Sequence, residues 1–529
     1  MKRRALMQRV AAGAAVAALP RRFAVASPER SRTLRIVPQA GLTSLDPIWT
    51  TALVTANHGY NVYDTLFATD SKLRAQPQMA EGYTVSDDGR TWLIRLREGL
   101  KFHDGEPVRA QDCAPSLARW AKRDTYGLTL DKYVDSYGVA DDRTIKIILK
   151  SPFPLLIDAI GKSFTAVPFM MPERFARTDP FKQVTEAVGS GPYRFLNDEY
   201  VSGSFIAYAK FDGYVPRQER PDWSSGGKVA HMERVEWHFI PDAATAAAAL
   251  QSGEVDWWEQ VQADLVPLLK QSRDIKLGIS DPTGNIGYMR FNHQQPPFNN
   301  VKLRRAILKA VNQPDYLAAV TGGNPELYQA CHSAFPCGTP YGAELGASLY
   351  KGDIAGARGD IEASGYAGEK IVIINPTDFA SIAPFGDVTY DLFRKLGLNV
   401  EIAETDWGTV VQRRTNREAV DKGGWSVFHT WWTGSSTANP AVSAPLRGQG
   451  STGWFGWYEN AKIEELTAQW LQATNDADRV RLTDAIQREA FDTIPSIPLG
   501  KFFIRSAYRS DLVGLLEGTA TYSWNVRRG

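Results

Sequence analysis

Residues 80–108 read AEGYTVSDDGRTWLIRLREGLKFHDGEPV, and this stretch decides how the chain around it folds. In residues 91–97 (TWLIRLR), apolar and polar side chains alternate as they do in a half-buried β-strand. The turn sequence DDG at 87–89 precedes this strand, so we predict a β-hairpin. A second tight turn, DG at 104–105, leads to a helix that begins near Ala110. The stretch therefore specifies scaffold rather than chemistry.

Strand and helix signals alternate on both sides of this stretch. Residues 144–149 form another strand candidate. Asp242 can cap a helix over 243–251, which Gly253 would end, and Asn300 can cap a further helix. These signals predict a protein that mixes helices with strands.

The second half of the chain repeats the pattern of a buried strand followed by a helix. Residues 370–375 read as the strand and 387–396 as the helix, a succession that predicts a partly parallel sheet and an α/β fold. The length of 529 residues exceeds what one hydrophobic core usually organises, so we expect two or more packed units. Apolar and charged contents of 43% and 22% are those of a globular protein.

The first 26 residues have a composition of their own. Basic residues stand at positions 2, 3, 4 and 9, a weakly apolar run covers 10–19, and Ala-Val-Ala ends at Ala26. This order predicts a secretory signal peptide cleaved near Ala26. Arg3-Arg4 also resembles a twin-arginine signal, so both export routes stay open.

Export would leave a free periplasmic protein. The apolar run is about half as long as a membrane-spanning helix, and no cysteine follows it where a lipid-anchoring cysteine would stand. Removal of residues 1–26 takes away six basic residues and no acidic one, which changes the formal net charge from +1 to −5. We therefore expect no nucleic-acid partner and no membrane insertion.

The three cysteines fit an oxidising compartment. Cys331 and Cys337 flank a turn-rich stretch, and we predict a disulfide between them. A metal site with His332 stays open as an alternative, although it lacks a second ligand pair nearby. Cys113, within a helical pattern, is interpreted as a buried apolar residue.

Residues 80–108, with Ala110-Gln-Asp after them, resemble the signature of bacterial extracellular solute-binding proteins of family 5. These are the dipeptide, oligopeptide and nickel-binding components of ABC importers. Further landmarks follow in the family's order; they are Leu45-Asp-Pro, Tyr63-Asp-Thr-Leu, Gly189-Ser-Gly-Pro-Tyr, Gly253-Glu-Val-Asp, Phe291-Asn, Pro297-Phe-Asn-Asn and Trp431-Trp-Thr-Gly. The resemblance therefore covers nearly the whole chain after residue 26.

The resemblance implies a type II, cluster C-like periplasmic binding protein with two lobes, an extra subdomain and a hinge of two crossings. We expect the first lobe to comprise residues 27–70, 191–290 and 502–529. Residues 71–190 would form the extension subdomain and 291–501 the second lobe. The expected ligand site is the cleft between the lobes, and a ligand that bridges both would favour the closed state.

Seven residues are candidates for contact with a ligand. The resemblance brings Trp257, Trp407 and Trp432 near the cleft, and aromatic walls suit a small enclosed solute. Tyr288 and Asn292 stand beside the proposed lobe crossing. The full set is Trp49, Trp257, Tyr288, Asn292, Trp407, Trp432 and Ser435. Arg290, Arg413, Arg414 and Arg447 are considered as carboxylate anchors, but a surface position explains each of them more simply.

The chain departs from its peptide-binding relatives at the position after Trp-Thr-Gly. Dipeptide-type relatives carry an Asp there that pairs with the ligand's ammonium group, whereas this chain has Ser435 and then Asn439 before a proline. A buried ammonium without a carboxylate is costly, so we expect a neutral, N-blocked or anionic solute. A peptide binder with another anchor, Asp406 or Glu259, stays open.

Other functions are weighed against solute binding. A hydrolase is disfavoured because the chain has no G-x-S-x-G or H-E-x-x-H motif, and we predict no catalytic residue and no enzyme. A metal-chelate or haem carrier is kept open by His429, although the seven histidines are scattered; we predict no metal site and no cofactor. The predicted partners are a small solute and membrane permease subunits, with a signalling receptor as the alternative partner, and we expect a monomer.

Overall fold

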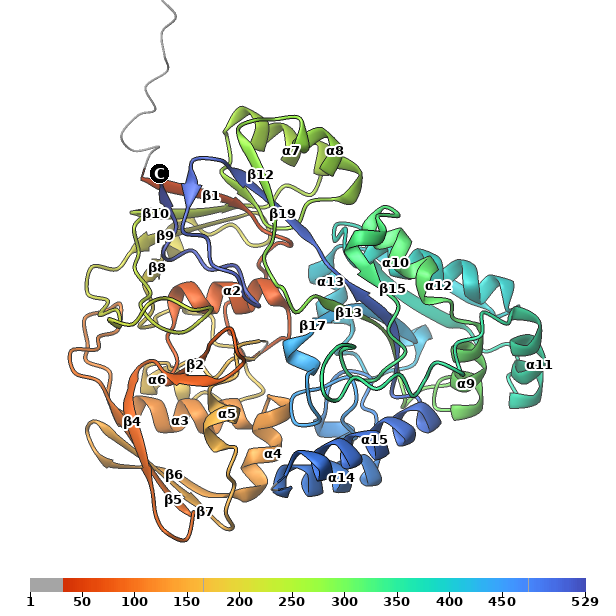
Figure 1. Ribbon diagram of the computed structural model, residues 1–529, viewed down its shortest axis with the longest axis horizontal. Helices are drawn as coiled ribbons and strands as arrows, with labels where there is room; N and C mark the ends of the chain where they lie inside the picture. Colours follow the sequence, from red (N-terminus) through yellow and green to blue (C-terminus); the bar gives the residue numbers. More distant parts are fainter. Residues whose placement is uncertain (1–31, 165, 474) are drawn as a thin grey trace, which may run out of the picture.

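A computed structural model describes residues 32–164, 166–473 and 475–529. The predicted signal peptide, with its cleavage near Ala26, lies outside the described residues. Three main sheets organise the chain (Figure 1), and each has helices against it.

A seven-stranded mixed sheet forms the first lobe. Its order is β12 (Ile275–Ile279), β19 (Arg505–Arg509), β11 (Trp257–Trp258), β1 (Thr33–Val37), β10 (Arg234–His238), β9 (Phe205–Lys210) and β8 (Tyr193–Phe195). Strand β1 is parallel to β10 and β11, and the other pairs are antiparallel. The helices of this lobe are α2 (Leu53–Val62), α7 (Ala243–Ser252) and α8 (Val266–Lys270).

Helix α7 has the two ends that the sequence predicts. The Asp242 side chain accepts a hydrogen bond from the Thr245 backbone N–H, and Gly253 ends the helix with a φ of 74°. A left-handed residue at this place favours glycine because it has no Cβ to clash with the preceding turn.

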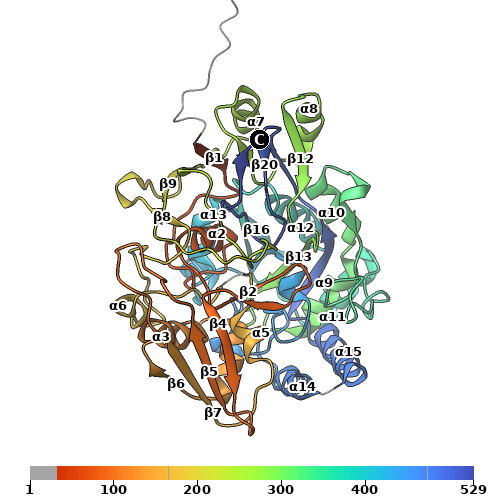
Figure 2. The same ribbon diagram turned by 60° about the vertical axis from the view of Figure 1, so that its left-hand side comes forward.

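The hairpin predicted from residues 80–108 belongs to an antiparallel four-stranded sheet. Its order is β4 (Ala80–Val85), β5 (Thr91–Leu96), β7 (Thr144–Leu149) and β6 (Val134–Asp141). Trp92, Ile94 and Leu96 of β5 are buried. Helix α3 (Ala110–Ala121) lies against this sheet, as Figure 2 shows, and contains the buried Cys113. The subdomain also holds α4 (Thr125–Tyr133), α5 (Leu156–Ile160) and α6 (Glu173–Ala176), with the small sheet of β2 (Phe67–Thr69) and β3 (Ala75–Pro77) beside it.

A six-stranded sheet forms the second lobe. Its order is β14 (Tyr328–Gln329), β18 (Ser496–Phe502), β13 (Asn285–Phe291), β17 (Val427–Thr433), β15 (Ile371–Pro376) and β16 (Val400–Thr405). Strand β15 is parallel to β16 and β17, which confirms the predicted partly parallel sheet. The helices are α9 (Val301–Ala310), α10 (Gln313–Thr321), α11 (Ile354–Ser364), α12 (Ala383–Lys395), α13 (Trp407–Arg413), α14 (Ala461–Gln472) and α15 (Asp476–Thr493).

Helix α12 begins four residues before the predicted start at 387. Pro384 lies in its first turn, where the missing backbone N–H needs no partner, and the buried Phe385 follows.

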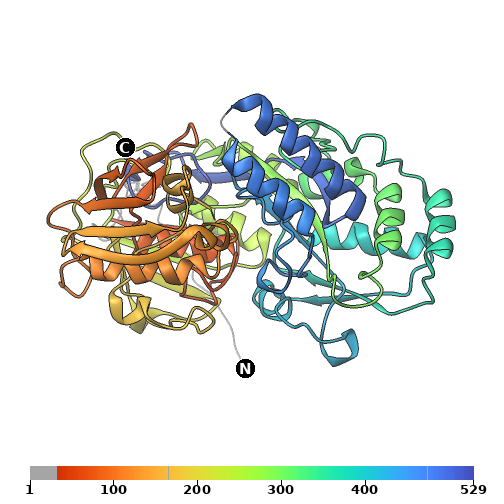
Figure 3. The same ribbon diagram turned by 90° about the horizontal axis from the view of Figure 1, so that it is seen from below.

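The chain passes between the two lobes twice, at residues 280–284 and at 503–504. Figure 3 shows the two halves side by side with these connections between them. Strand β13 starts at Asn285 and already belongs to the second sheet. We therefore propose a lobe boundary at 280–284 in place of the 290/291 boundary drawn from the sequence, and Tyr288 falls in the second lobe. A short pair, β20 (Leu512–Val513) and β21 (Arg527–Arg528), follows the return crossing.

Two smaller predictions concern covalent structure and the membrane. The disulfide between Cys331 and Cys337 is confirmed, with Cα atoms 5.8 Å apart. Over the described ranges, no helix combines the length and the apolar character that crossing a membrane requires.

Candidate ligand-binding site

Cavities A, B and C lie at the boundary between the lobes, as does a fourth cavity of about 80 Å³ that shares Gln260 and Ile504 with cavity C. Cavity A measures about 310 Å³ and is lined by Ile48 to Thr51, Lys122 to Thr125, Leu128, Lys162, Ala166, Phe181, Thr415, Arg417, Trp432, Val442, Ala444 and Ser451 to Phe455 with Trp457. Cavity B measures about 190 Å³ and shares Lys162, Trp432 and Val442 with cavity A. Cavity C, about 50 Å³, lies beside the two crossings. Because both lobes contribute to each wall, closure of the lobes shapes these spaces.

Three of the predicted ligand residues line the cavities. Trp49 lines cavity A, and its backbone N–H donates to the carbonyl of Asp46 in the turn before α2. Trp432, near the end of β17, separates cavities A and B and lines both. Ser435 follows this strand and lines cavity B. Their role in ligand binding stays a prediction.

The other four predicted residues lie in the packed interior and line none of these three cavities. Trp257 and Tyr288 are 2% and 1% exposed and belong to the hydrophobic core. The Asn292 amide donates to the carbonyl of Trp425, and its oxygen accepts from the Gln294 backbone N–H, which fixes the turn after β13. Trp407 starts α13 and packs its ring edge-on against Phe379.

The segment after β17 is polar but uncharged. The Ser435 backbone N–H donates to the Thr283 hydroxyl at 3.3 Å, which ties cavity B to the first crossing. Gly434 permits this approach, because a Cβ at that position would stand 2.6 Å from the Thr283 carbonyl oxygen. Asn439 accepts from the backbone N–H of Ala441. Neither Ser435 nor Asn439 therefore offers a carboxylate to a bound cation.

The four arginines considered from the sequence donate hydrogen bonds within the protein, and none of them lines cavity A, B or C. Arg290 donates to the carbonyls of Phe455, Pro445 and Pro495, and burial lowers its pKa to about 9. Arg413 donates to two backbone carbonyls in its own lobe. The surface position expected from the sequence is wrong for three of the four, because Arg290, Arg414 and Arg447 are buried.

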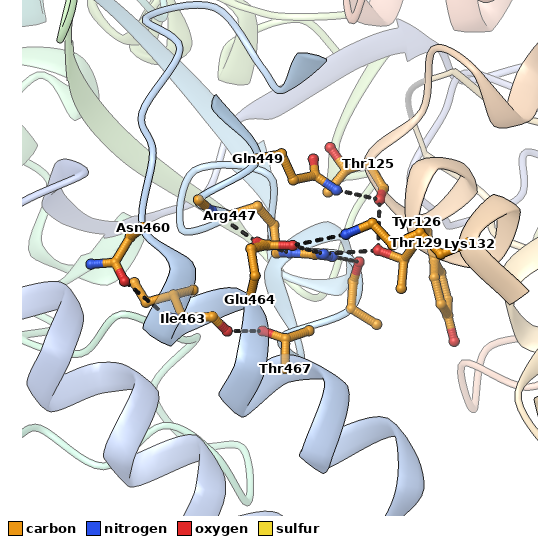
Figure 4. A network of polar contacts seen from close by, with 12 residues as sticks. Thr125, Tyr126, Thr129, Lys132, Arg447, Gln449, Asn460, Ile463, Glu464 and Thr467 are labelled. Atoms are coloured by element: carbon orange, nitrogen blue, oxygen red, sulfur yellow. Dashed lines mark hydrogen bonds and ion pairs between the residues drawn. The ribbon is translucent and has the colours of Figure 1, made fainter. Parts of the chain in front are cut away.

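Arg414 joins the second lobe to the first, and Arg447 joins it to the extension subdomain. Arg414 donates to the hydroxyls of Thr50 and Thr51 at 3.1 and 3.2 Å. Arg447 pairs with Glu464 of α14 and donates to the Thr129 hydroxyl of α4 at 2.8 Å, as Figure 4 shows. Although burial opposes ionisation, the hydrogen bonds from Arg447 keep the pKa of Glu464 below its ordinary value.

Sequence reasoning missed the charged residues of cavity A. Lys122, Arg123, Lys162 and Arg417 line it together with one acid, Asp124. Lys162 forms an ion pair with Asp124, and Lys122 with Asp131 outside the cavity. These residues come from segments far apart in the chain, so no local pattern could have grouped them.

Two acids line cavity C: Glu259 is buried, and Asp281 is half-buried with its Oδ2 shielded from solvent. Glu259 accepts hydrogen bonds from the Gln39 backbone N–H, the Asn57 amide and the Thr521 hydroxyl, and burial raises its pKa. Asp281 accepts from Thr283 through Oδ1, while its buried Oδ2 has no hydrogen-bond partner. Burial raises the pKa of Asp281 to about 7, although Thr283 and Lys501 act in the opposite direction.

In the part of the chain that the structure describes, no group of three or more His, Cys, Asp or Glu side chains is arranged to hold a metal ion. His429 is buried in β17, its Nε2 lies 2.7 Å from the Thr389 hydroxyl, and burial lowers its pKa to about 3. The Asp406 carboxylate caps α13 by accepting from Thr409. Neither side chain lines cavities A, B or C.

Two lobes joined by two crossings, with cavities walled from both sides, define the class of two-lobed solute-binding proteins. The chain matches the model for bacterial extracellular solute-binding proteins, family 5, over residues 74–454. It belongs to this family, whose members are the substrate-binding components of ABC importers.

The similarity extends over nearly the whole chain. This protein is 36% identical to a probable peptide ABC transporter periplasmic-binding protein of Sinorhizobium fredii. The alignment spans 523 residues and covers 98% of each chain. Two solved structures are 20% identical with TM-scores of 0.79 and cover 94% of this chain. One is the PBP AgaA from A. tumefaciens R10 in complex with agropinic acid, and the match covers 99% of its chain. The other is a dipeptide binding protein from Pseudoalteromonas sp. SM9913 in complex with Met-Leu, and the match covers 100% of its chain. The fold is that of a type II periplasmic binding protein of cluster C.

Proposed function

We propose that this protein is exported to the periplasm, captures a small solute between its lobes and delivers it to the permease of an ABC importer. The cavities at the lobe boundary are the observation that carries this proposal, since a solute held there contacts both lobes at once. A ligand that makes more contacts in the closed state shifts the protein toward that state. The permease would then recognise the closed surface.

The solute we propose is not an ordinary peptide with a free N-terminus. Ser435 and Asn439 line cavity B without a carboxylate, and the acid in its wall, Asp158, is exposed to solvent. Cavity A carries an excess of basic residues. Both features disfavour a buried ammonium group and favour a neutral or anionic solute.

A peptide with a different acidic anchor is the second candidate, and cavity C is the observation that favours it. Glu259 accepts three hydrogen bonds and can accept a fourth, and Asp281 Oδ2 has no partner. A ligand ammonium group could donate to both acids. Asp406 is a weaker anchor because its carboxylate caps α13.

Native mass spectrometry of the protein as isolated, followed by small-angle scattering, tests the proposal. We expect a retained solute and a smaller radius of gyration when that solute saturates the protein. Unchanged dimensions at saturation would refute capture by closure.

Calorimetry with a dipeptide and its N-acetyl derivative separates the two candidate solute classes. We expect the free dipeptide to bind no better than the acetylated one. Tight binding that depends on the free ammonium group would favour the second candidate, and its loss in E259Q would identify the anchor.

A further inference from the structure

Arg123 presents a guanidinium group to cavity A from the extension subdomain, where it follows α3. The group lies 5.1 Å from the ring centroids of both Trp49 and Phe181, and its Nη2 donates to the Trp49 carbonyl at 2.9 Å. No ion pair joins Arg123 to another described residue; the nearby Asp46 is already bound by Arg119. Two aromatic rings thus hold a planar cation at the cavity wall without a carboxylate partner.

Arg417 presents a second guanidinium group from the opposite lobe. It lies 4.5 Å from the ring centroid of Trp457, and its Nη2 donates to the Ser451 carbonyl at 2.8 Å. Within the described ranges it too has no ion-pair partner. The arrangement repeats that of Arg123: one arginine stacked on a tryptophan and positioned by one backbone carbonyl, on the other side of the same cavity.

The charge of cavity A favours an anion. The acid in its wall, Asp124, is engaged by Lys162. Arg123 and Arg417 therefore keep most of their N–H donors available, and a guanidinium fork fits the two oxygens of a carboxylate. Arg123 is half-buried without a counter-ion, which is unfavourable, so an anion beside it would gain more than it would in water.

Apolar rings form part of the remaining wall, beside hydroxyl and lysine side chains. Trp432 and Trp454 meet edge-on with ring centroids 5.4 Å apart, and both are nearly buried. A volume of about 310 Å³ is at the lower end for small-molecule sites, which typically begin near 300 Å³. The occupant must therefore be compact, with an apolar body between its charged groups.

We propose that cavity A binds a small organic dicarboxylate, with one carboxylate held by Arg123 of the extension subdomain and the other by Arg417 of the second lobe. The ligand's charges would then join the lobes directly, and its apolar part would lie on Trp432 and Trp454. This inference rests on the proposed function, because it names the class of solute that the closing lobes retain.

A matched set of probes tests the charge requirement. N-acetylglutamate, N-acetylglutamine and N-acetylglutamine amide are close in size and carry two, one and no carboxylates. We expect calorimetry to rank their affinities in that order. Replacement of either arginine, in R123Q or R417Q, should weaken N-acetylglutamate binding at least tenfold and reduce the difference between the probes.

Two further variants keep the test decisive. R123K retains the charge but loses the fork, and we expect intermediate affinity at an unchanged melting temperature. R95Q is the matched control, because Arg95 lies on the exposed side of β5 and pairs with Glu81 far from the cavity; its affinity should equal that of the unmodified protein.

Equal binding of the acid and its amide, or no binding of N-acetylglutamate at millimolar concentration, would overturn the dicarboxylate site. Compaction by an uncharged solute would overturn it as well, yet would leave solute capture by closure intact. Failure of closure with every solute would instead refute the proposed function. The two failures are therefore distinguishable.

Discussion

At Asp281 a single carboxyl group couples ionisation to the hinge. Its pKa is raised to about 7 because the carboxyl group is largely shielded from water in cavity C, and the opposing effects of Thr283 and Lys501 do not compensate. An acid with a raised folded-state pKa gives stability that is fully present below its unfolded pKa, near 4, and is lost as the pH rises through 7. Ionisation of Asp281 in the folded protein therefore lowers the free energy of unfolding by at most ~4 kcal/mol.

Asparagine stays neutral at every pH, so the stability of D281N relative to the unmodified protein should increase as the pH is raised from 5 to 8. Thermal melts at both pH values measure the difference. D212N is the control, since the Asp212 side chain is 90% exposed. Identical pH profiles for D281N and the unmodified protein would contradict a raised pKa at this position.

At the scale of elements, α4 of the extension subdomain contacts the second lobe. Arg447 donates to the Thr129 hydroxyl, and the Gln449 amide donates to the Thr125 carbonyl at 3.1 Å (Figure 4). Glu464 holds Arg447 in place through two hydrogen bonds from the guanidinium group. A helix from one half is thus fixed to a loop of the other only while the lobes are together.

The variant T129V removes the hydroxyl acceptor and leaves the pair of Arg447 and Glu464 intact. A hydrogen bond to a charged group contributes about 1.5–3 kcal/mol, so we expect affinity for the retained solute to fall about tenfold or more. The melting temperature of the ligand-free protein should change little. T84V, at an exposed site on β4, is the control for calorimetry. Equal affinities of T129V and T84V would show that this contact does not support closure.

At the scale of the whole molecule, closure brings aromatic rings of both lobes together. Trp432, 4% exposed, meets Phe164 of the extension subdomain with ring centroids 6.0 Å apart. Opening would expose Trp432 to water. We expect solute binding to shift tryptophan emission to shorter wavelength, and W432F to lose most of that shift.

W92F is the control for this measurement, because Trp92 packs against Tyr83 within the extension subdomain. Its emission change on binding should match that of the unmodified protein. If W432F kept the full emission shift, the shift would come from another tryptophan, and the contact between Trp432 and Phe164 would not report closure.

Local features were predictable from the sequence because their causes are local. Asp242 and Gly253 bound α7 through a side-chain cap and a left-handed backbone, both of which nearest neighbours decide. Asn300 likewise caps α9. The lobe boundary was not predictable, since β13 is buried along its whole length and carries no alternating pattern. A buried strand looks the same in either sheet.

The sequence by itself determined the family, the α/β architecture, the caps and turns of the signature hairpin, and the cysteine pair, because each depends on residues close together in the chain or on an ordered set of motifs. Only the tertiary structure decided which charges share a cavity. Arg123 and Arg417 stand nearly three hundred positions apart, and both face cavity A because two sheets and two crossings bring their segments together. Burial and the electrostatic environment depend on the whole fold, and neither can be read from sequence neighbours.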